Sequence, residues 1–192
     1  MAPFGVFALI AQTINKITGD NPNQILELLG ALAFYMFAVI IGLIAHALFT
    51  YNGLIKLLTN MSIKKFYKGI APAQLLAFST SSSGATLPVT MERCEEELGV
   101  SEEVSSFVLP LGATINMDGT ALYECVAAMF IAQAYGIELS FLQQMIVVST
   151  ALVASIGAAG IPMAGLVMIS VVLTAVGLPL EGIGLILAVD RI

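Results

Sequence analysis

The chain has 192 residues, of which 58% are hydrophobic and 10% are charged, and its formal net charge is -6. Soluble domains contain roughly 45–50% apolar and about 25% charged residues, so this composition predicts a multi-pass integral membrane protein. The acidic balance and the lack of a basic face argue against a nucleic-acid partner.

The N-terminal part predicts two membrane helices followed by a basic segment. Residues 1–20 are expected to end one helix, and residues 24–50 supply the roughly 20 apolar residues that a transmembrane helix needs. Residues 51–69 then hold four of the seven basic side chains: Lys56, Lys64, Lys65 and Lys68. Because positive residues are retained on the inner side of a membrane, we predict that residues 51–69 form a cytoplasmic loop.

A serine- and glycine-rich stretch, Ser79–Pro88, interrupts the next apolar segment. The apolar residues 71–78 before it are too few to cross a bilayer, and few apolar residues follow it before Glu92. We therefore predict a re-entrant hairpin over residues 62–98 that enters and leaves on the cytoplasmic side. The hydroxyl groups and free backbone N–H groups near its second helix favour an anionic ligand.

Asp118 stands within an apolar helix that we predict over residues 103–135. A charged Asp at the centre of a membrane helix costs about 2.5–3.5 kcal/mol on insertion scales, so it needs a partner or a cation. We expect Gly119 to allow unwinding within Asn116–Thr120, which would free carbonyl oxygens for a sodium ion beside the carboxylate. The alternative is a structural Asp that pairs with a neighbouring helix.

A second interruption, Ser155–Pro162, repeats the pattern. It predicts a re-entrant hairpin over residues 139–176 that enters from the outside, followed by the start of a last helix over residues 179–192. Asp190 in that helix is a cation-binding candidate for the same reason as Asp118. A duplicated broken segment points to the substrate site of a secondary transporter. The alternative is two ordinary membrane helices with glycine kinks.

Enzymatic alternatives find little support in the sequence. An intramembrane serine protease built on Ser83 and His46, the only histidine, would lack an orienting third group. An aspartyl protease would need two aspartates that share a proton, and neither Asp lies in a Gly-x-Gly-Asp context. We therefore predict that the protein is not an enzyme. Glu124 is either a proton-carrying acid or a polar-face residue, and the sequence leaves both open.

Three motifs in order carry a family resemblance: the serine-rich tip, Asn116–Thr120 and Gly157–Pro162. They resemble the dicarboxylate/amino acid:cation symporters, the glutamate transporter family, along essentially the whole chain. The resemblance implies an all-α elevator fold with two inverted re-entrant hairpins, a scaffold helix over residues 1–20 and a partial transport domain over residues 21–192. It also implies a homotrimer and a second hairpin that acts as the extracellular gate.

The resemblance further implies roles for individual residues. Contacts to the substrate are expected from Ser81, Ser83, Thr120, Ile161 and Gly165. Sodium ligands are expected from Thr114, Asn116, Asp118, Ser155, Ile156 and Ala158, with Asp190 as a further candidate. Sodium is the coupling ion, and no other cofactor is expected.

These observations predict sodium-coupled symport of glutamate or aspartate across the plasma or inner membrane. A C4-dicarboxylate or neutral amino acid symporter of the same family is the nearest alternative, and a non-transporting membrane fragment is the alternative from a different class. Both ends of the chain lie in apolar runs, so we expect a partial subunit that lacks the last-helix residues that select the substrate.

Overall fold

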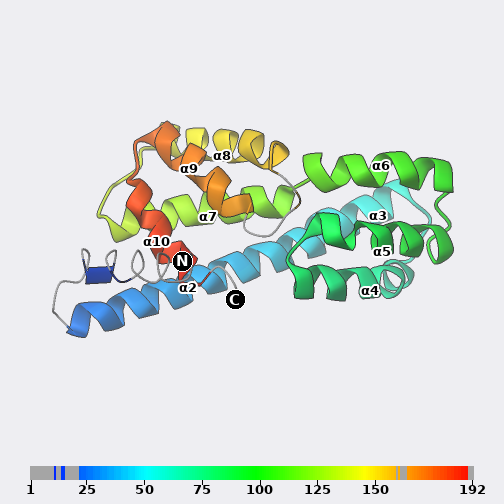
Figure 1. Ribbon diagram of the computed structural model, residues 1–192, viewed down its shortest axis with the longest axis horizontal. Helices are drawn as coiled ribbons and strands as arrows, with labels where there is room; N and C mark the ends of the chain where they lie inside the picture. Colours follow the sequence, from blue (N-terminus) through cyan, green and yellow to red (C-terminus); the bar gives the residue numbers. More distant parts are fainter. Residues whose placement is uncertain (1–10, 12–13, 16–21, 159, 161–163, 190–192) are drawn as a thin grey trace. The chain divides into compact units, whose positions relative to one another are not determined.

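The computed structural model describes residues 11, 14–15, 22–158, 160 and 164–189 (Figure 1). Every regular element among these residues is a helix, which confirms the predicted all-α fold class. The roles predicted for Ile161 and Asp190 lie outside the described residues. The predicted scaffold helix lies almost entirely outside them as well, and so does its boundary at residue 20.

The chain divides into two compact units. We call Met1–Gly42, Asp118–Ala154 and Gly165–Ile192 the core unit, and Leu43–Met117 with Ser155–Ala164 the hairpin unit. Each of the two interrupted segments found in the sequence contributes its tip to the hairpin unit.

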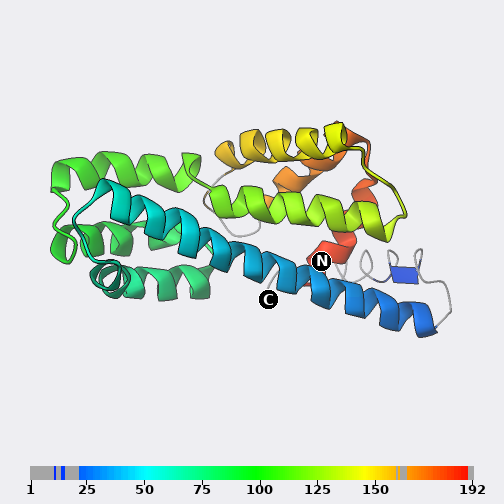
Figure 2. The ribbon, with the colours of Figure 1, turned by 180° about the vertical axis from the view of Figure 1, so that it is seen from behind.

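Apolar side chains hold the core unit together. Its main helices are α2 (Pro22–His46), α7 (Asp118–Ala134), α8 (Phe141–Ile156) and α9 (Ala164–Val176), joined by the short η2 (Leu180–Gly182) and α10 (Ile183–Leu187). Helices α7 and α8 run side by side in both views (Figures 1 and 2). The shared core includes the buried side chains of Leu32, Ile131, Val147, Ile169, Leu173 and Ile186. Such close packing makes the unit sensitive to the loss of a single side chain.

One helix in the described part of the chain is long and apolar enough to cross a membrane. It runs over Ile25–Leu58, 34 residues, and an 18-residue window within it has a mean hydropathy of 2.5. It comprises α2, a π-helical turn η1 (Ala47–Tyr51) and α3 (Asn52–Leu58). The helix thus continues past the predicted end at residue 50.

The predicted loop over residues 51–69 is therefore wrong in its local structure. Only residues 59–62 separate α3 from α4 (Ile63–Thr80), so the lysines of this segment lie on helices. The reason is composition: leucine and lysine continue a helix well, and the polar Thr59-Asn60 pair comes eight residues later than the break that we expected.

Helices α4, α5 (Ser83–Glu96) and α6 (Glu102–Ile115) lie side by side in the hairpin unit (Figures 1 and 2). Serine caps begin two of them: the Ser62 side chain accepts a hydrogen bond from the Lys65 N–H at 3.2 Å, and Ser82 accepts one from the Ala85 N–H at 3.2 Å. The pair α4–α5 occupies the range for which the sequence predicts the first hairpin; its re-entry into a membrane stays a prediction.

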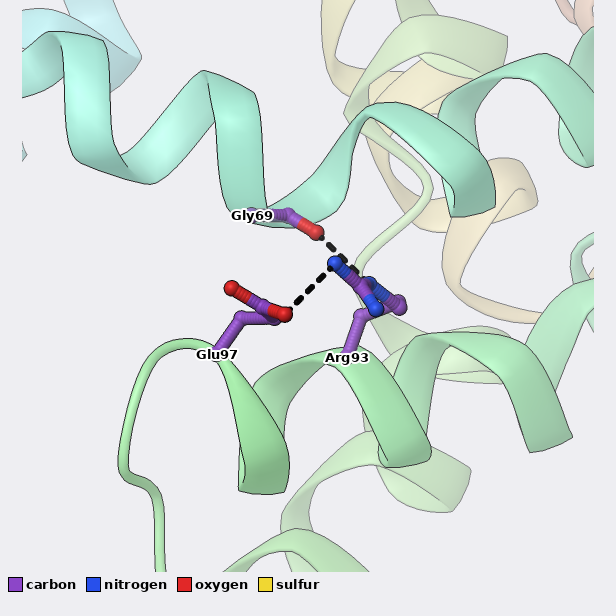
Figure 3. Close-up of polar contacts among 3 residues, drawn as sticks. All are labelled: Gly69, Arg93 and Glu97. Atoms are coloured by element: carbon purple, nitrogen blue, oxygen red, sulfur yellow. Dashed lines mark hydrogen bonds and ion pairs between the residues drawn. The ribbon is translucent and has the colours of Figure 1, made fainter.

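Polar bonds join α4 to α5 at the base of the pair, which is the end away from residues 81–82 (Figure 3). The Arg93 Nε donates to the Gly69 carbonyl oxygen at 3.0 Å, and Arg93 Nη2 lies 3.1 Å from Glu97 Oε1. A Cβ atom on Gly69 would lie 2.6 Å from Leu98 Cδ2, so glycine allows the close approach. The Ser105 hydroxyl donates to Glu95. Directional bonds thus fix α4, α5 and α6 at their common base.

Candidate functional site

Asn116 and Met117 separate α6 from α7 and lie outside helical structure. Asn116 has φ -97° and ψ 69°, and its N–H still bonds the Gly112 carbonyl at 2.9 Å. Asp118 is the first residue of α7, where the helix dipole favours a negative charge. The predicted interruption within Asn116–Thr120 is thus confirmed at Asn116 and Met117, whereas Gly119 itself is helical. The break falls earlier because an Asp stabilises a helix start.

The carboxyl end of α6 supplies acceptor oxygens at this break. The last carbonyl groups of a helix have no helical partner and carry a partial negative charge, which favours a cation. The Thr114 hydroxyl donates to the Leu111 carbonyl at 3.0 Å, and the side chains of Thr114 and Asn116 are exposed. Both residues were predicted as sodium ligands, and the structure places them next to each other at this helix end.

The tip of the α4–α5 hairpin is formed by Ser81 and Ser82. Ser81 adopts a left-handed conformation, with φ 50° and ψ 35°, which is uncommon for a residue other than glycine. This conformation ends α4, and Ser82 then begins α5 as its cap. The Ser82 side chain is buried, whereas the side chains of Ser81 and Ser83 are exposed. The two serines predicted to contact substrate therefore flank a structural one.

Gly160 of the second interruption contacts this tip directly. Its carbonyl oxygen accepts hydrogen bonds from the Ser82 hydroxyl at 2.8 Å and from the Gly84 N–H at 2.9 Å. A Cβ atom on Gly84 would lie 3.0 Å from that same oxygen. One on Gly160 would lie 3.1 Å from the Ala113 carbonyl oxygen and 3.1 Å from the Gly84 nitrogen. Both interrupted tips and the end of α6 thus converge within the hairpin unit.

Other predicted residues of the second interruption belong to the same unit. Ser155 and Ala158 are buried, and the Ala158 N–H donates to the Ser155 carbonyl at 3.2 Å. Ile156, the last residue of α8, is 46% exposed. The backbone that was predicted to coordinate sodium therefore forms a turn immediately before Gly160.

Thr120 and Gly165 lie together in the core unit. A Cβ atom on Gly165 would lie 3.5 Å from Thr120 Cγ2 and 3.3 Å from Tyr123 Cε1. Two predicted substrate contacts from distant parts of the sequence are thus neighbours. One turn beyond Thr120, the Glu124 carboxyl group is buried, and neither oxygen has a hydrogen-bond partner among the described residues. An isolated acid in such surroundings is itself a functional candidate.

Ser82, Gly84 and Gly160 were not predicted as individual site residues. Ser82 carries a usable pattern, since a serine directly before a helical stretch is a preferred cap. The glycines carry none, because both tips contain several small residues and only the fold decides which of them meet.

The atoms at these tips that could coordinate an ion are oxygen atoms of carbonyl, hydroxyl and amide groups. Among the residues that the structure describes, no three His, Cys, Asp or Glu side chains are grouped around a possible metal position. Oxygens freed by interrupted helices suit a monovalent cation such as sodium, and the positive end of a helix dipole suits an anion.

Comparison with known proteins gives a family match over the whole chain. Residues 1–192 match the family described as the Sodium:dicarboxylate symporter family. The chain is 49% identical over 189 residues to an excitatory amino acid transporter of Caenorhabditis elegans, covering 98% of this chain and 37% of the relative. It is 50% identical over 188 residues to human excitatory amino acid transporter 5, covering 98% and 33%. It is 49% identical over 189 residues to bovine excitatory amino acid transporter 1, covering 98% and 34%. The chain thus spans about a third of the length of these curated relatives.

Proposed function

The chain belongs to the sodium:dicarboxylate symporter family, and from this premise we propose that the protein carries glutamate or aspartate across the plasma or inner membrane together with sodium. The relatives named excitatory amino acid transporters direct the proposal to acidic amino acids. The observation that carries it is the junction of the two interrupted segments, where Gly160 accepts hydrogen bonds from Ser82 at 2.8 Å and from Gly84 at 2.9 Å.

We assign substrate binding to the two tips, which meet in the hairpin unit, and the family resemblance adds Thr120 and Gly165 of the core unit. The N–H groups of Gly84, Ala85 and Thr86 at the start of α5 already donate to Gly160 and Ser82. A carboxylate would therefore be attracted there by the positive end of the helix dipole. Ser81 and Ser83 have exposed side chains whose hydroxyl groups make no hydrogen bond to the described residues, so they are available to a ligand. Thr120 and Gly165, which are neighbours, complete the assignment, and Ile161 is included by resemblance.

We assign the coupling ions to the oxygen atoms around the break between α6 and α7. Thr114, Asn116 and Asp118 supply hydroxyl, amide and carboxylate oxygens there. The turn at Ser155–Ala158 supplies backbone oxygens, and Asp190 is included on its charge. Sodium would draw the second tip toward the α6 end, because each contributes carbonyl oxygens. Cation binding and closure of the tips would then be one event.

We also propose the membrane arrangement that the family resemblance implies. Both helical pairs would be re-entrant hairpins of an elevator-type transport domain, the second acting as the extracellular gate, in a protein that assembles as a trimer. Lys64→Cys should react with a membrane-impermeant thiol reagent only from the cytoplasmic side. Cys94 and Cys125 are replaced beforehand, so that only position 64 can react. Labelling of position 64 from outside would overturn the orientation.

The direct test is uptake by the full-length gene product that contains this chain, reconstituted in liposomes with an inward sodium gradient. We expect saturable accumulation of labelled aspartate or glutamate, and none when choline replaces sodium. Unlabelled succinate and alanine serve as competitors. Stronger inhibition by succinate than by aspartate would assign the protein to C4-dicarboxylates, and stronger inhibition by alanine would assign it to neutral amino acids. Sodium-independent uptake would contradict symport.

Asp118→Asn tests the ion assignment within the same assay. The substitution keeps the shape of the side chain and removes its charge. We expect the apparent sodium affinity to fall at least about tenfold, since a charged ligand is lost from an apolar region. An unchanged sodium dependence would remove Asp118 from the site.

A further inference from the structure

Four lysines form a basic patch around the corner between α3 and α4. Lys56 lies in the last turn of α3, and Lys64, Lys65 and Lys68 lie in the first turns of α4. All four side chains are exposed, and none forms an ion pair with another described residue. Lys64 and Lys68 are four residues apart and therefore share one face of α4. Nothing in the proposed transport site uses these charges.

The positive charge of this lysine patch is not neutralised locally. The sequence contains no acid between Glu27 and Glu92. The acids of the hairpin unit all lie within Glu92–Glu103, where Glu97 is paired with Arg93 and Glu95 accepts from Ser105. Charge is thus sorted along the unit, with the cations at the α3–α4 corner and the acids along α5 and the start of α6.

Exposed leucines surround the patch on its α3 side. Leu54, Leu57 and Leu58 are 47%, 81% and 72% exposed at the end of the helix that is long enough to cross a bilayer. Lys56 stands among them. A lysine in this setting lays its aliphatic stem on apolar surface and extends its ammonium group into water. Leucines in lipid would therefore hold the four ammonium groups at the depth of the phospholipid headgroups.

We propose that this lysine patch binds the headgroups of anionic phospholipids in the cytoplasmic leaflet. The proposal rests on the membrane orientation given under the proposed function. Charge complementarity selects the lipid, because an anionic leaflet presents many phosphates in the plane where α3 ends. Each lysine near such a surface strengthens binding by about 1 kcal/mol, or about fivefold, and salt weakens the effect. The bound lipid would anchor the start of the first hairpin.

The test uses the full-length protein in nanodiscs of phosphatidylcholine. The nanodiscs also contain a fluorescent phospholipid with an anionic headgroup, which is the acceptor for energy transfer. We expect the preference for phosphatidylserine and for phosphatidylinositol bisphosphate over phosphatidylcholine to fall on the order of 100-fold in the triple variant Lys64→Gln, Lys65→Gln, Lys68→Gln. The matched control replaces the same three lysines by arginine, which keeps the charge and should keep the preference. High salt should reduce the preference of the wild type but not of the glutamine variant.

An equal lipid preference in the wild type and the glutamine variant would overturn the proposal, and so would loss of the preference in the arginine variant. Thermal unfolding in pure phosphatidylcholine shows whether the glutamine variant is folded; if it is not, the single variants Lys64→Gln and Lys68→Gln, at about fivefold each, decide. Sodium-driven uptake without an anionic lipid preference refutes this proposal alone. A lysine-dependent preference without uptake refutes the transport proposal alone.

Discussion

The helical pairs α4–α5 and α8–α9 follow the same sequence plan but are held together by different forces. The α4–α5 pair has serine caps, an arginine bonded to the carbonyl of the opposite helix, and buried polar side chains at Ser82 and Thr86. The α8–α9 pair buries Val147, Ala151, Ile169, Val172 and Leu173 in the apolar core of its unit. One hairpin is thus fastened by directional bonds, and the other by packing.

This difference bears on which hairpin moves. Hydrogen bonds to charged groups fix geometry, whereas apolar contacts tolerate small sliding movements. The tip of the second pair, Ser155–Ala164, groups with the hairpin unit while its helical arms lie mainly in the core unit. If the second hairpin is the gate, as proposed above, the first hairpin would be the fixed half of the junction and Gly160 the part that docks on it.

Ile169→Ala should have the largest effect on stability. Its side chain is fully buried in α9, so truncation leaves a cavity and should cost about 2–4 kcal/mol. Val167→Ala on the same helix is the control, because Val167 is 66% exposed and should change little. Thermal unfolding in detergent measures both. Equal losses would show that packing does not hold the second pair together.

Gly84→Ala should nearly abolish transport while leaving the protein folded. The added methyl group would lie 3.0 Å from the Gly160 carbonyl oxygen, so the two tips must shift apart by a few tenths of an ångström, which weakens both hydrogen bonds to that oxygen. At about 1 kcal/mol for each bond, a fall in uptake of up to about 30-fold is expected. Gly112→Ala in α6 has open space and is the control. Unchanged uptake in Gly84→Ala would show that transport does not depend on the contact between the two tips.

Ser82→Ala should weaken the junction more mildly. It removes the bond to Gly160 at 2.8 Å and the cap on the Ala85 N–H at 3.2 Å, and keeps the Gly84 bond. We expect a loss of about 1–2 kcal/mol, seen as roughly a tenfold weaker apparent affinity for aspartate. Ser79→Ala is the matched control, because the Ser79 hydroxyl bonds only the Leu76 carbonyl of its own helix. Similar losses in both variants would contradict the role given to Ser82.

Arg93→Gln should lower stability by about 1 kcal/mol, the smallest effect of the set. The variant loses the bond to the Gly69 carbonyl at 3.0 Å, which joins α4 to α5. Glu97→Gln breaks only an exposed i,i+4 ion pair and should cost less than about 0.5 kcal/mol. Unfolding temperatures compare the two variants. A larger loss in Glu97→Gln would mean that the ion pair, and not the bond between helices, closes the base.

The sequence predicted the all-α class and the places where helices are interrupted, because breaks depend on local composition. Serine and glycine at residues 79–84 and the polar Asn116 mark two of the breaks that the structure describes. The apolar pattern did not reveal where the first long helix ends. The π-helical turn at Ala47–Tyr51 shifts the pattern, yet the chain stays helical through it to Leu58. Nor could the pattern show that the break ends before Asp118. The helix dipole favours an Asp as the first residue of α7, and sequence patterns do not fix such boundaries to within two residues.

The sequence was less informative about which tip residues meet. Ser81 and Ser83 were singled out by resemblance, yet Ser82 bonds the opposite tip. Consecutive serines look alike in a sequence, whereas in the structure the left-handed Ser81 ends one helix and the buried Ser82 begins the next. The proximity of Thr120 to Gly165 depends on the packing of α7 with α9, which involves residues 45 positions apart.

The central claim, that the two tips close together when sodium and substrate bind, is tested most directly by a disulfide between Ser83→Cys and Gly160→Cys with Cys94 and Cys125 replaced. The Ser83 Cβ lies 3.5 Å from the position of a Cβ on Gly160, within the range that a disulfide needs. We predict that the cross-link forms faster with sodium plus aspartate than with choline. A cross-linking rate that is indifferent to sodium and aspartate, in protein that thermal unfolding shows to be folded, would contradict the claim.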